Sequence, residues 1–564
     1  MGNIKLQISR TNLKPRGYGP PLRASLKPRE PSTNYKPKTL NRAGGPAKML
    51  PRRVFLKKLG GLGATLTFDS KNRMENTVQE LDFDLIVVGV GTAGMPCAIA
   101  AAQKGAKVLV VEKAERVGGT LHYTGGHMSA GGTRHQAAKG VFGDTPQDHY
   151  QEIMQISKNT AVPYIVKLAT DEAPKTIDWL DGLGFEFAPE SPRIVYGHVP
   201  YTMARTQYGK DAGDSIFKAI KPLWDQLVAS GNITLLLHTE LKELIVESGE
   251  VVGVRVEREK VKGEREKTPF TIYRSPFTIL TTGGYGSNPD FFAKKHPNHP
   301  RLVSTAAATS TGEGIAIAEQ IGAKFWNANT HISSLGGVET QPNSGNADFW
   351  TAWAMVFTTS YRPAREIYVN ELGQRFMDES NPDPDYRERA VAEQPQKRFW
   401  VVFDEKALNT PPMTVVPKWS VEKIKQEAEQ EKCAWVANSV AELATKTGLP
   451  AATLEATVGQ FNQFCQNKVD AEYGRADLSH AVESGPFYAI LTYATSLITF
   501  GGLAVNEQLQ VLDNQNKPIP NLYAAGEILG AGATTGNAFC GGMLVTPAIS
   551  FGRILGHHGF LIKI

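Results

Sequence analysis

A set of closely spaced glycines with one carboxylate downstream has the clearest chemistry in the sequence. Gly89-Val90-Gly91-Thr92-Ala93-Gly94 follows an apolar run, and Glu112 stands 23 residues after Gly89. Such glycines permit a tight turn and let the backbone approach a pyrophosphate, while the following helix offers free N–H groups. A carboxylate at that distance can accept hydrogen bonds from ribose hydroxyls. The pattern predicts a dinucleotide site that contains Gly89, Gly91, Thr92, Ala93, Gly94, Glu112 and Lys113.

Three glycine pairs follow within 15 residues: Gly118-Gly119, which precedes Thr120, then Gly125-Gly126 and Gly131-Gly132. Pairs at this spacing indicate close approach of the backbone to an extended, buried ligand. The first motif alone fits both FAD and NAD, so it does not choose between them. Similar glycine motifs recur at Thr282-Gly283-Gly284, at Gly526-Glu527 and at Gly541-Gly542.

The first motif needs a strand before it and a helix after it. The sequence predicts a strand over 84–88, a helix over 95–104 and a strand over 107–111, which form one βαβ unit with parallel strands. Further strands are expected at 233–237, 251–257 and 277–280.

The character of the chain changes between 326 and 480. Tryptophans, prolines and polar helical stretches replace the glycine-rich turns there, and glycine motifs return at Gly501-Gly502 and at 523–527. We interpret 326–480 as a cap domain inserted into a nucleotide-binding domain that occupies 82–325 and 481–564.

Composition describes an ordinary globular protein of more than one domain, with 564 residues and 41% hydrophobic residues. The net charge is +5, but residues 1–48 hold eleven Lys and Arg against one Glu, so the remainder carries 5 − 10 = −5. This balance predicts a disordered basic tail over 1–48 and no nucleic-acid partner. Four scattered cysteines favour neither disulfides nor a metal site, and no apolar run is long enough for a membrane span.

A segment over 49–70 contains a candidate export signal. Arg52-Arg53 and the apolar stretch behind it resemble a twin-arginine signal, and Met49 is an alternative start to Met1. The apolar stretch is short and lacks a clear cleavage site, which is equally consistent with a basic surface segment. The protein is therefore expected to be periplasmic if the signal operates and cytoplasmic otherwise.

The motifs together resemble the fumarate reductase and succinate dehydrogenase flavoprotein family, which includes soluble fumarate reductases and 3-ketosteroid dehydrogenases. The resemblance covers 83–556 and adds Thr311-Gly312-Glu313-Gly314 and Gly373-Gln374-Arg375-Phe376 to the motifs above. It implies an α/β fold, with a discontinuous Rossmann-like FAD-binding domain and an inserted α+β cap domain.

The same resemblance implies how FAD is held. Glu527 is expected to face the ribityl chain, and the helix that follows Gly541-Gly542-Met543-Leu544 is expected to point its N-terminus at the flavin N1–C2=O edge. Family members with covalent flavin have a histidine ahead of the pair matched by Gly125-Gly126. That position is Gly119 here, so non-covalent FAD is expected.

The family shares hydride transfer between flavin N5 and a carbon next to a carbonyl or carboxylate. Fumarate reductases bind two carboxylates through histidines and arginines, of which His331 is matched, whereas Ile498 and Phe539 replace a histidine and an arginine. The place of the proton-donating arginine falls at Asp383, with Arg387 a few residues on. Because two of four anchors are apolar, a dicarboxylate loses charge-assisted hydrogen bonds of about 1.5–3 kcal/mol each.

The ketosteroid dehydrogenase pattern is also incomplete. Its C-terminal tyrosine falls at Ala538, its anchoring glycine matches Gly542, and Tyr386 lies near the place of its cap tyrosine. We hypothesise an apolar pocket for a hydrophobic, carbonyl-bearing substrate such as an enone. The candidate groups are Arg387 and Tyr386 for proton transfer, His331 for orientation and the Gly541-Gly542 backbone as a carbonyl anchor, with Tyr123 and His127 as further candidates.

Each of these side chains also has a purely structural interpretation: His331 as a core histidine, Arg387 as part of a solvated charged face, and Tyr123 and His127 as packing groups. The competing functions are a fumarate reductase-like enoate reductase, an NAD-linked dehydrogenase and a flavin-retaining binding protein without turnover. The sequence has no CxxCH haem motif, so a separate electron carrier or oxygen is expected as the partner. It leaves open whether the reaction is reduction or dehydrogenation.

Overall fold

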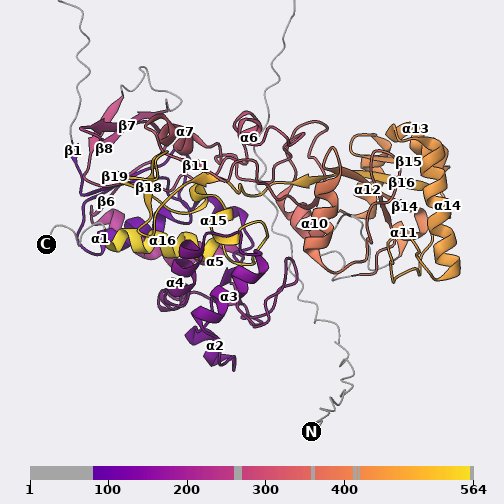
Figure 1. The fold of residues 1–564 in the computed structure, drawn as a ribbon, viewed down its shortest axis with the longest axis horizontal. Coiled ribbons are helices and arrows are strands. Elements are labelled where there is room, and N and C mark those ends of the chain that lie inside the picture. The colour runs from indigo at the N-terminus through magenta and orange to yellow at the C-terminus, as the bar shows by residue number, and fades with distance from the viewer. Residues whose placement is uncertain (1–80, 260–269, 357–361, 411–415, 417–418, 559–564) are drawn as a thin grey trace, which may run out of the picture. The chain divides into compact units, whose positions relative to one another are not determined.

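A computed structural model describes residues 81–259, 270–356, 362–410, 416 and 419–558 (Figure 1). The expected basic tail over 1–48 and the candidate signal over 49–70 lie outside these residues. None of the helices that the structure describes is both long and apolar enough to span a membrane. All four cysteines are free and buried.

A six-stranded sheet forms the centre of the nucleotide-binding domain. Its order is β18(Gln510–Leu512), β19(Pro518–Ala524), β10(Thr278–Leu280), β2(Leu85–Val88), β3(Val108–Val111) and β6(Ile233–Leu236). All pairs are parallel except that of the edge strand β18 with β19. Every residue of β2 and β3 is buried, as expected for strands covered on both faces.

The strand order reverses at β2. The chain first moves from β2 to β3 and β6 on one side, and later places β10 and β19 on the other. Parallel sheets bind ligands at the carboxyl ends of the strands beside such a reversal. Gly89, Glu112, Thr281 and Ala525 directly follow β2, β3, β10 and β19, so the motifs singled out in the sequence meet at this edge.

Two helices pack unusually closely beside the sheet. They are α1(Gly94–Ala102) and α16(Val545–His558), which lie side by side in Figure 1. A Cβ added at Gly552 would lie 2.1 Å from the Ala93 carbonyl oxygen, and one at Gly556 would lie 2.2 Å from the Cys97 carbonyl oxygen. These two glycines therefore permit the backbone contact that fixes the N-terminus of α1 relative to the C-terminal segment.

The remaining elements of this domain support the central sheet. A second sheet has the order β1(Leu81–Asp82), β9(Thr271–Arg274), β8(Glu250–Arg258) and β7(Thr239–Glu247). The helices are α2(Arg134–Ala138), α3(Pro146–Ile156), α4(Pro163–Gly182), α5(Gly213–Ala229), α6(Pro289–Lys295), α7(Glu313–Gln320) and α15(Gly532–Thr535). Two short pairs join β4(Met128–Ser129) to β5(Thr206–Gln207) and β11(Phe325–Trp326) to β17(Gly502–Leu503).

The inserted domain is built on a five-stranded sheet. Its strands are β12(Ser334–Gly337), β16(Phe487–Thr495), β14(Arg398–Asp404) and β13(Ile367–Val369) in order, with β15(Ala434–Ala437) also paired to β16. Its helices are α8(Phe349–Val356), α10(Pro384–Glu393), α11(Glu405–Asn409), α12(Val421–Glu429), α13(Val440–Thr447) and α14(Ala451–Asn467). This mixture of helices and antiparallel strands agrees with the expected α+β cap.

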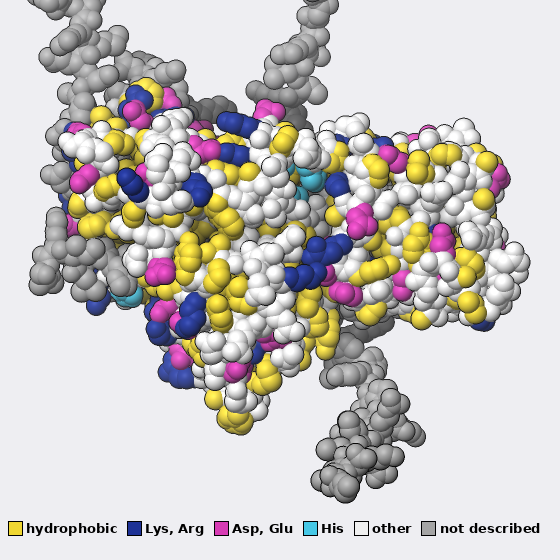
Figure 2. Space-filling view, in the orientation of Figure 1, with side chains coloured by type: hydrophobic (Ala, Val, Ile, Leu, Met, Phe, Trp, Pro, Cys, Tyr) yellow, Lys and Arg dark blue, Asp and Glu magenta, His cyan; other side chains and the backbone are white. Residues whose placement is uncertain are grey.

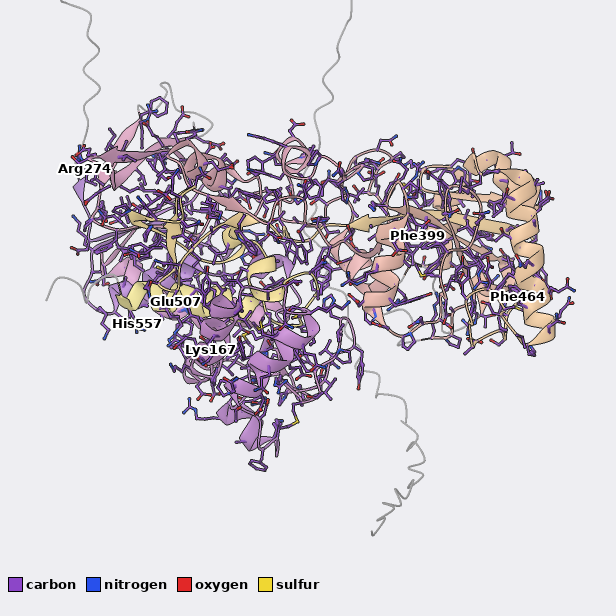
Figure 3. The ribbon with its side chains drawn as sticks, viewed as in Figure 1. Lys167, Arg274, Phe399, Phe464, Glu507 and His557 are labelled. Carbon is purple, nitrogen blue, oxygen red and sulfur yellow. The ribbon has the colours of Figure 1, made fainter. Side chains whose placement is uncertain are left out.

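The strand β14 separates two hydrophobic cores in this domain. Phe399 and Phe403 pack in one core, and Trp400 and Val402 pack with α13 and α14 in the other. This follows from the alternation of side chains along a strand. Figure 3 labels Phe399 on β14 and Phe464 on α14.

The return to the nucleotide-binding domain lies later than the sequence suggested. We placed it at residue 481, but β16(Phe487–Thr495) pairs with β14 along its whole length, from Asp404 with Phe487 to Arg398 with Tyr493. The chain therefore leaves the inserted sheet only after Thr495. The glycine-poor character of 481–495 matches a central antiparallel strand, which sequence composition alone did not reveal.

Candidate active site

The first glycine motif forms a tight strand-to-helix turn. Gly89 has a φ of +93°, a conformation that side chains disfavour, and it directly follows β2. A Cβ added at Gly94 would lie 2.0 Å from the Gly89 carbonyl oxygen. Gly94 is therefore required for the packing of the turn, whereas a Cβ added at Gly91 would make only an ordinary contact, 3.8 Å from the Gly119 Cα.

The N-terminus of α1 opens onto a pocket that we call the cofactor channel. No side chain caps α1, because its N-cap residue is Ala93. The first N–H groups of a helix without a cap suit a phosphate. Fourteen of the predicted cofactor residues line the channel: Gly89, Gly91, Thr92, Ala93, Glu112, Lys113, Gly119, Thr120, Thr282, Gly283, Gly526, Glu527, Met543 and Leu544.

Seven predicted cofactor residues do not line the channel: Gly94, Gly118, Gly125, Gly126, Gly284, Gly541 and Gly542. The structure gives several of them a packing role instead. A Cβ at Gly126 would lie 2.5 Å from the Ala212 carbonyl carbon, and one at Gly542 would lie 2.4 Å from the Ser129 nitrogen. These positions bring backbone segments together behind the channel wall.

Glu112 is held rigidly at the end of β3. One of its oxygens accepts a hydrogen bond from Val90 N at 2.8 Å, and the other accepts one from Ala114 N at 2.8 Å. Each carboxylate oxygen has a second lone pair for a further donor. The carboxylate is therefore oriented for ribose hydroxyls before a ligand binds. Lys113 is ion-paired with Glu313 at 2.8 Å, so the motif at 311–314 meets the channel as well.

Glu527 lies against the channel on the opposite side of the sheet reversal. Its carboxylate accepts hydrogen bonds from Thr499 N at 2.9 Å and from the Thr499 hydroxyl at 3.2 Å. Burial nevertheless raises the pKa of Glu527 to about 7. A buried carboxyl group with a pKa of about 7 can accept a hydrogen bond from a polyhydroxy chain when it is ionised, or donate one to the chain when it is protonated.

A second pocket, which we call the substrate chamber, adjoins the cofactor channel. The two share three lining residues, Leu497, Ile498 and Leu544. The remaining chamber residues come from distant parts of the chain: His127, Val195, His198, Val199, Tyr201, Thr206, Thr305, Ser334, Phe349, Ala352, Thr495, Phe539 and Gly541. No lysine or arginine is among these residues. Ile498 and Phe539, the two apolar replacements noted in the sequence, both line the chamber.

The polar groups of the chamber are uncharged. Burial and the neighbouring Arg193 lower the pKa of His127 to about 4, and burial together with His127 lowers the pKa of His198 to about 4. Burial raises the pKa of Tyr201, whose hydroxyl donates to the Gly541 carbonyl oxygen at 2.5 Å. At neutral pH the chamber therefore offers neutral hydrogen-bonding groups in apolar surroundings.

The three side chains predicted for catalysis lie elsewhere. His331 is half-buried, and its ring lies among those of Phe292, His296 and His299, with ring centroids 4.9, 5.6 and 5.3 Å away. Within the described ranges neither of its ring nitrogens has a hydrogen-bond partner. It lines neither pocket, so the structure does not bring it to the chamber.

Arg387 and Tyr386 belong to α10 of the inserted domain. Arg387 is 1% exposed, and burial lowers its pKa. The Tyr386 hydroxyl accepts a hydrogen bond from Asp378 N at 3.1 Å. Neither side chain lines the cofactor channel or the chamber.

Sequence reasoning missed most of the chamber side chains. His127 was a further candidate because it adjoins a glycine pair, and Tyr123, the other such candidate, lines the cofactor channel. No sequence pattern pointed to His198 or Tyr201, since they lie in a segment without glycine pairs or periodic hydrophobicity. Within the described ranges no group of three or more His, Cys, Asp or Glu side chains is arranged to hold a metal ion.

Known proteins share this architecture. A family model described as "FAD binding domain" matches residues 84–544. The chain is 27% identical over 476 residues to the probable fumarate reductase Ifc3 of Shewanella frigidimarina, which covers 84% of this chain and 74% of that protein. It is 27% identical over 495 residues to the vinyl phenol reductase of Lactiplantibacillus plantarum, covering 84% and 96% respectively.

A solved structure of a fumarate reductase has a similar fold. The open conformation of a flavocytochrome c3 fumarate reductase superposes with a TM-score of 0.65 at 26% identity, and covers 86% of this chain and 78% of that one. The uncapped α1, the oriented Glu112 and the glycine-lined channel fit the FAD that this family binds. The chain therefore belongs to the family of the FAD-binding domain and is an FAD-dependent oxidoreductase.

Proposed function

We propose that this protein transfers hydride between FAD and a carbon–carbon bond next to a carbonyl group, in a hydrophobic and uncharged substrate such as an enone. The observation that carries this proposal is the composition of the substrate chamber. It joins the cofactor channel at Leu497, Ile498 and Leu544, and its described lining contains aromatic and aliphatic side chains but no cation.

The chamber disfavours a dicarboxylate for a physical reason. A carboxylate that leaves water must gain charge-assisted hydrogen bonds, each of about 1.5–3 kcal/mol, to offset its desolvation. Ile498 and Phe539 offer none at the places where the resemblance expects a histidine and an arginine. The relatives support the reaction type more than the substrate, because one is named for fumarate and another for a vinyl phenol.

The bound FAD would be non-covalent. The position expected for a linking histidine is Gly119, and no histidine is among the described residues that line the channel. The nearby His122 is engaged through both ring nitrogens, with Asp214 Oδ1 at 2.9 Å and the Val117 carbonyl oxygen at 3.1 Å. FAD would supply the hydride chemistry, and the chain would bind the substrate, exclude water and support the charge on its oxygen.

Electrons would come from, or pass to, a separate carrier or oxygen. Figure 2 shows basic and acidic side chains interspersed on the visible face, without a continuous basic stripe.

The test uses the purified flavoprotein with reduced methyl viologen as the electron donor. We expect reoxidation of the dye with benzylideneacetone, a hydrophobic enone, and little or none with fumarate. Oxidation of a saturated ketone with an artificial acceptor would assign the dehydrogenase direction instead. Efficient reduction of fumarate without reduction of the enone would contradict the proposal. Denaturation in acid followed by filtration checks the cofactor, since non-covalent FAD appears in the filtrate.

A further inference from the structure

The side chain of His198 occupies a distinctive place in the substrate chamber. Its ring stacks on Phe539 with centroids 4.9 Å apart and an interplanar angle of 21°. Phe539 is in turn held edge to face by Phe500, with centroids 5.4 Å apart. One face of the imidazole is therefore covered by the Phe539 ring, and Phe539 itself occupies the position where the resemblance expects a carboxylate-binding arginine.

The charge state of His198 follows from its surroundings. Burial, together with the neighbouring His127, lowers its pKa to about 4. At neutral pH the ring is uncharged, so one nitrogen carries a proton and the other is an acceptor. A neutral imidazole is a poor proton donor to carbon, but it is a good hydrogen-bond donor to oxygen.

The burial of the two ring nitrogens decides which of them carries the proton. Nδ1 is fully buried and has no hydrogen-bond partner among the described residues. Nε2 is not among the buried atoms without a partner, and the His198 side chain as a whole is only half-buried. An unpaired buried N–H is costlier and rarer than an unpaired acceptor. The proton therefore belongs on Nε2, which leaves an N–H group for a ligand in the chamber.

We infer that His198, through its Nε2–H group, donates a hydrogen bond to the carbonyl oxygen of the substrate. This inference rests on the proposed function and names the group that recognises its uncharged oxygen. Reduction of an enone adds a hydride to the β-carbon and a proton to the α-carbon, with both electrons supplied by reduced FAD. Between the two additions the electron pair of the double bond resides largely on oxygen. A fixed donor at that oxygen strengthens its hydrogen bond as the charge develops.

Other polar groups of the chamber are less suited to this role. The Tyr201 hydroxyl already donates its proton to the Gly541 carbonyl oxygen, so it can only accept from a ligand. The Thr305 hydroxyl is directed at the Ser496 carbonyl oxygen at 3.4 Å. His127 packs edge to face against Tyr208, with ring centroids 5.3 Å apart, and lacks the flat stacking that fixes His198.

The test compares His198→Phe, His198→Gln and His135→Phe with the unaltered flavoprotein. His198→Phe keeps a flat ring on Phe539 and removes the donor, and His198→Gln retains an N–H donor. His135 is a matched control because it also stacks on a phenylalanine, Phe187, at 3.6 Å, but does not line the chamber. FAD content identifies any variant that fails to fold.

Two measurements are needed. The first is kcat and KM for benzylideneacetone with reduced methyl viologen. The second is the binding of benzylacetone and butylbenzene to the oxidised flavoprotein, followed by the change in flavin absorbance. These two probes have similar shape, and only benzylacetone has the oxygen.

We expect His198→Phe to lower kcat by roughly a hundredfold, as for other lost donors to a developing oxyanion, with a smaller change in KM. It should also abolish the preference for benzylacetone over butylbenzene, which His198→Gln partly restores and His135→Phe leaves intact. An unchanged kcat and an unchanged preference in His198→Phe would overturn the inference and leave the proposed function standing. An unaltered protein that reduces fumarate and binds neither neutral probe would overturn both.

Discussion

The cofactor channel and the substrate chamber adjoin each other, but they are lined by different kinds of residues. The channel is lined by glycines, small side chains and hydrogen-bonded carboxylates such as Glu112 and Glu527, at the ends of four neighbouring parallel strands. The chamber is lined by larger side chains from several distant segments, among them His198, whose ring stacks on Phe539.

This difference distinguishes residues that the cofactor requires from residues that can be exchanged to suit a substrate. A pyrophosphate is recognised by backbone N–H groups, so the channel needs glycines at fixed spacing and tolerates few other residues. A substrate is recognised by side chains, which can be exchanged without moving the backbone. The same fold can therefore hold FAD in one manner and accept substrates of different polarity.

The largest effect is expected from Gly94→Ala, which tests whether the channel depends on close backbone contact. The added Cβ would lie 2.0 Å from the Gly89 carbonyl oxygen, so the turn has to open, at a cost at or above the upper end of the range of about 1–3 kcal/mol that is typical of overpacking. We expect a protein that purifies without flavin or fails to fold, as measured by FAD content and thermal unfolding. Gly182→Ala is the control, because no atom lies within 4 Å of its added Cβ. A yellow, stable Gly94→Ala protein would refute this account of the channel.

Glu112→Gln is expected to weaken FAD binding by about ten- to a hundredfold, because charge-assisted hydrogen bonds to ribose are worth about 1.5–3 kcal/mol. The amide group would also oppose one of the two N–H donors, Val90 N or Ala114 N. Titration of the apoprotein with FAD, followed by flavin fluorescence, measures the effect. Glu115→Gln, at an exposed residue nearby, should bind FAD normally. Equal affinity in both variants would remove Glu112 from the cofactor site.

The double substitution Ile498→His with Phe539→Arg tests whether side chains alone set the polarity of the chamber. It introduces a cation and a polar donor into the lining, and we expect kcat/KM for fumarate to rise about tenfold, which corresponds to about 1.4 kcal/mol. Activity with the enone should fall. Phe539→Leu is the control, since it removes the ring without adding charge. No gain with fumarate, despite normal FAD content, would show that the chamber excludes it by shape.

The smallest effect is expected for Glu527→Gln, and it concerns the stability of the apoprotein. The pKa of Glu527 is raised to about 7, so the folded chain holds a proton that the unfolded chain has released. Stability is therefore greatest below the usual pKa of 4.5 and falls as the pH rises through 7. We expect a loss of about 1 kcal/mol between about pH 6 and pH 8 in the unaltered chain, and none from this group in the variant.

Urea unfolding at the two pH values measures this difference. Glu507→Gln is the matched control, because Glu507 is an exposed glutamate, labelled in Figure 3. Parallel pH dependence in the unaltered chain and in Glu527→Gln would show that Glu527 is solvated like an ordinary surface carboxylate.

Most of the cofactor site was predictable from the sequence. The strands expected at 84–88, 107–111 and 277–280 are β2, β3 and β10, and the expected helix is α1. Their local patterns suffice because each motif directly follows a buried strand, and parallel strands place their carboxyl ends at one edge. The glycines that do not line the channel were predicted as contacts because spacing does not distinguish a glycine that faces a ligand from one that faces protein.

The sequence by itself determined the strand-to-helix turn at Gly89, the carboxylate at Glu112 and the apolar residues at Ile498 and Phe539. Only the tertiary structure placed β16 in the inserted sheet, buried Arg387, kept Arg387 and His331 out of the chamber lining and stacked His198 on Phe539. The physical reason is the range of the interactions. A turn and a strand are fixed by neighbours along the chain, whereas His198 and Phe539 are 341 positions apart and meet only when the whole core has packed.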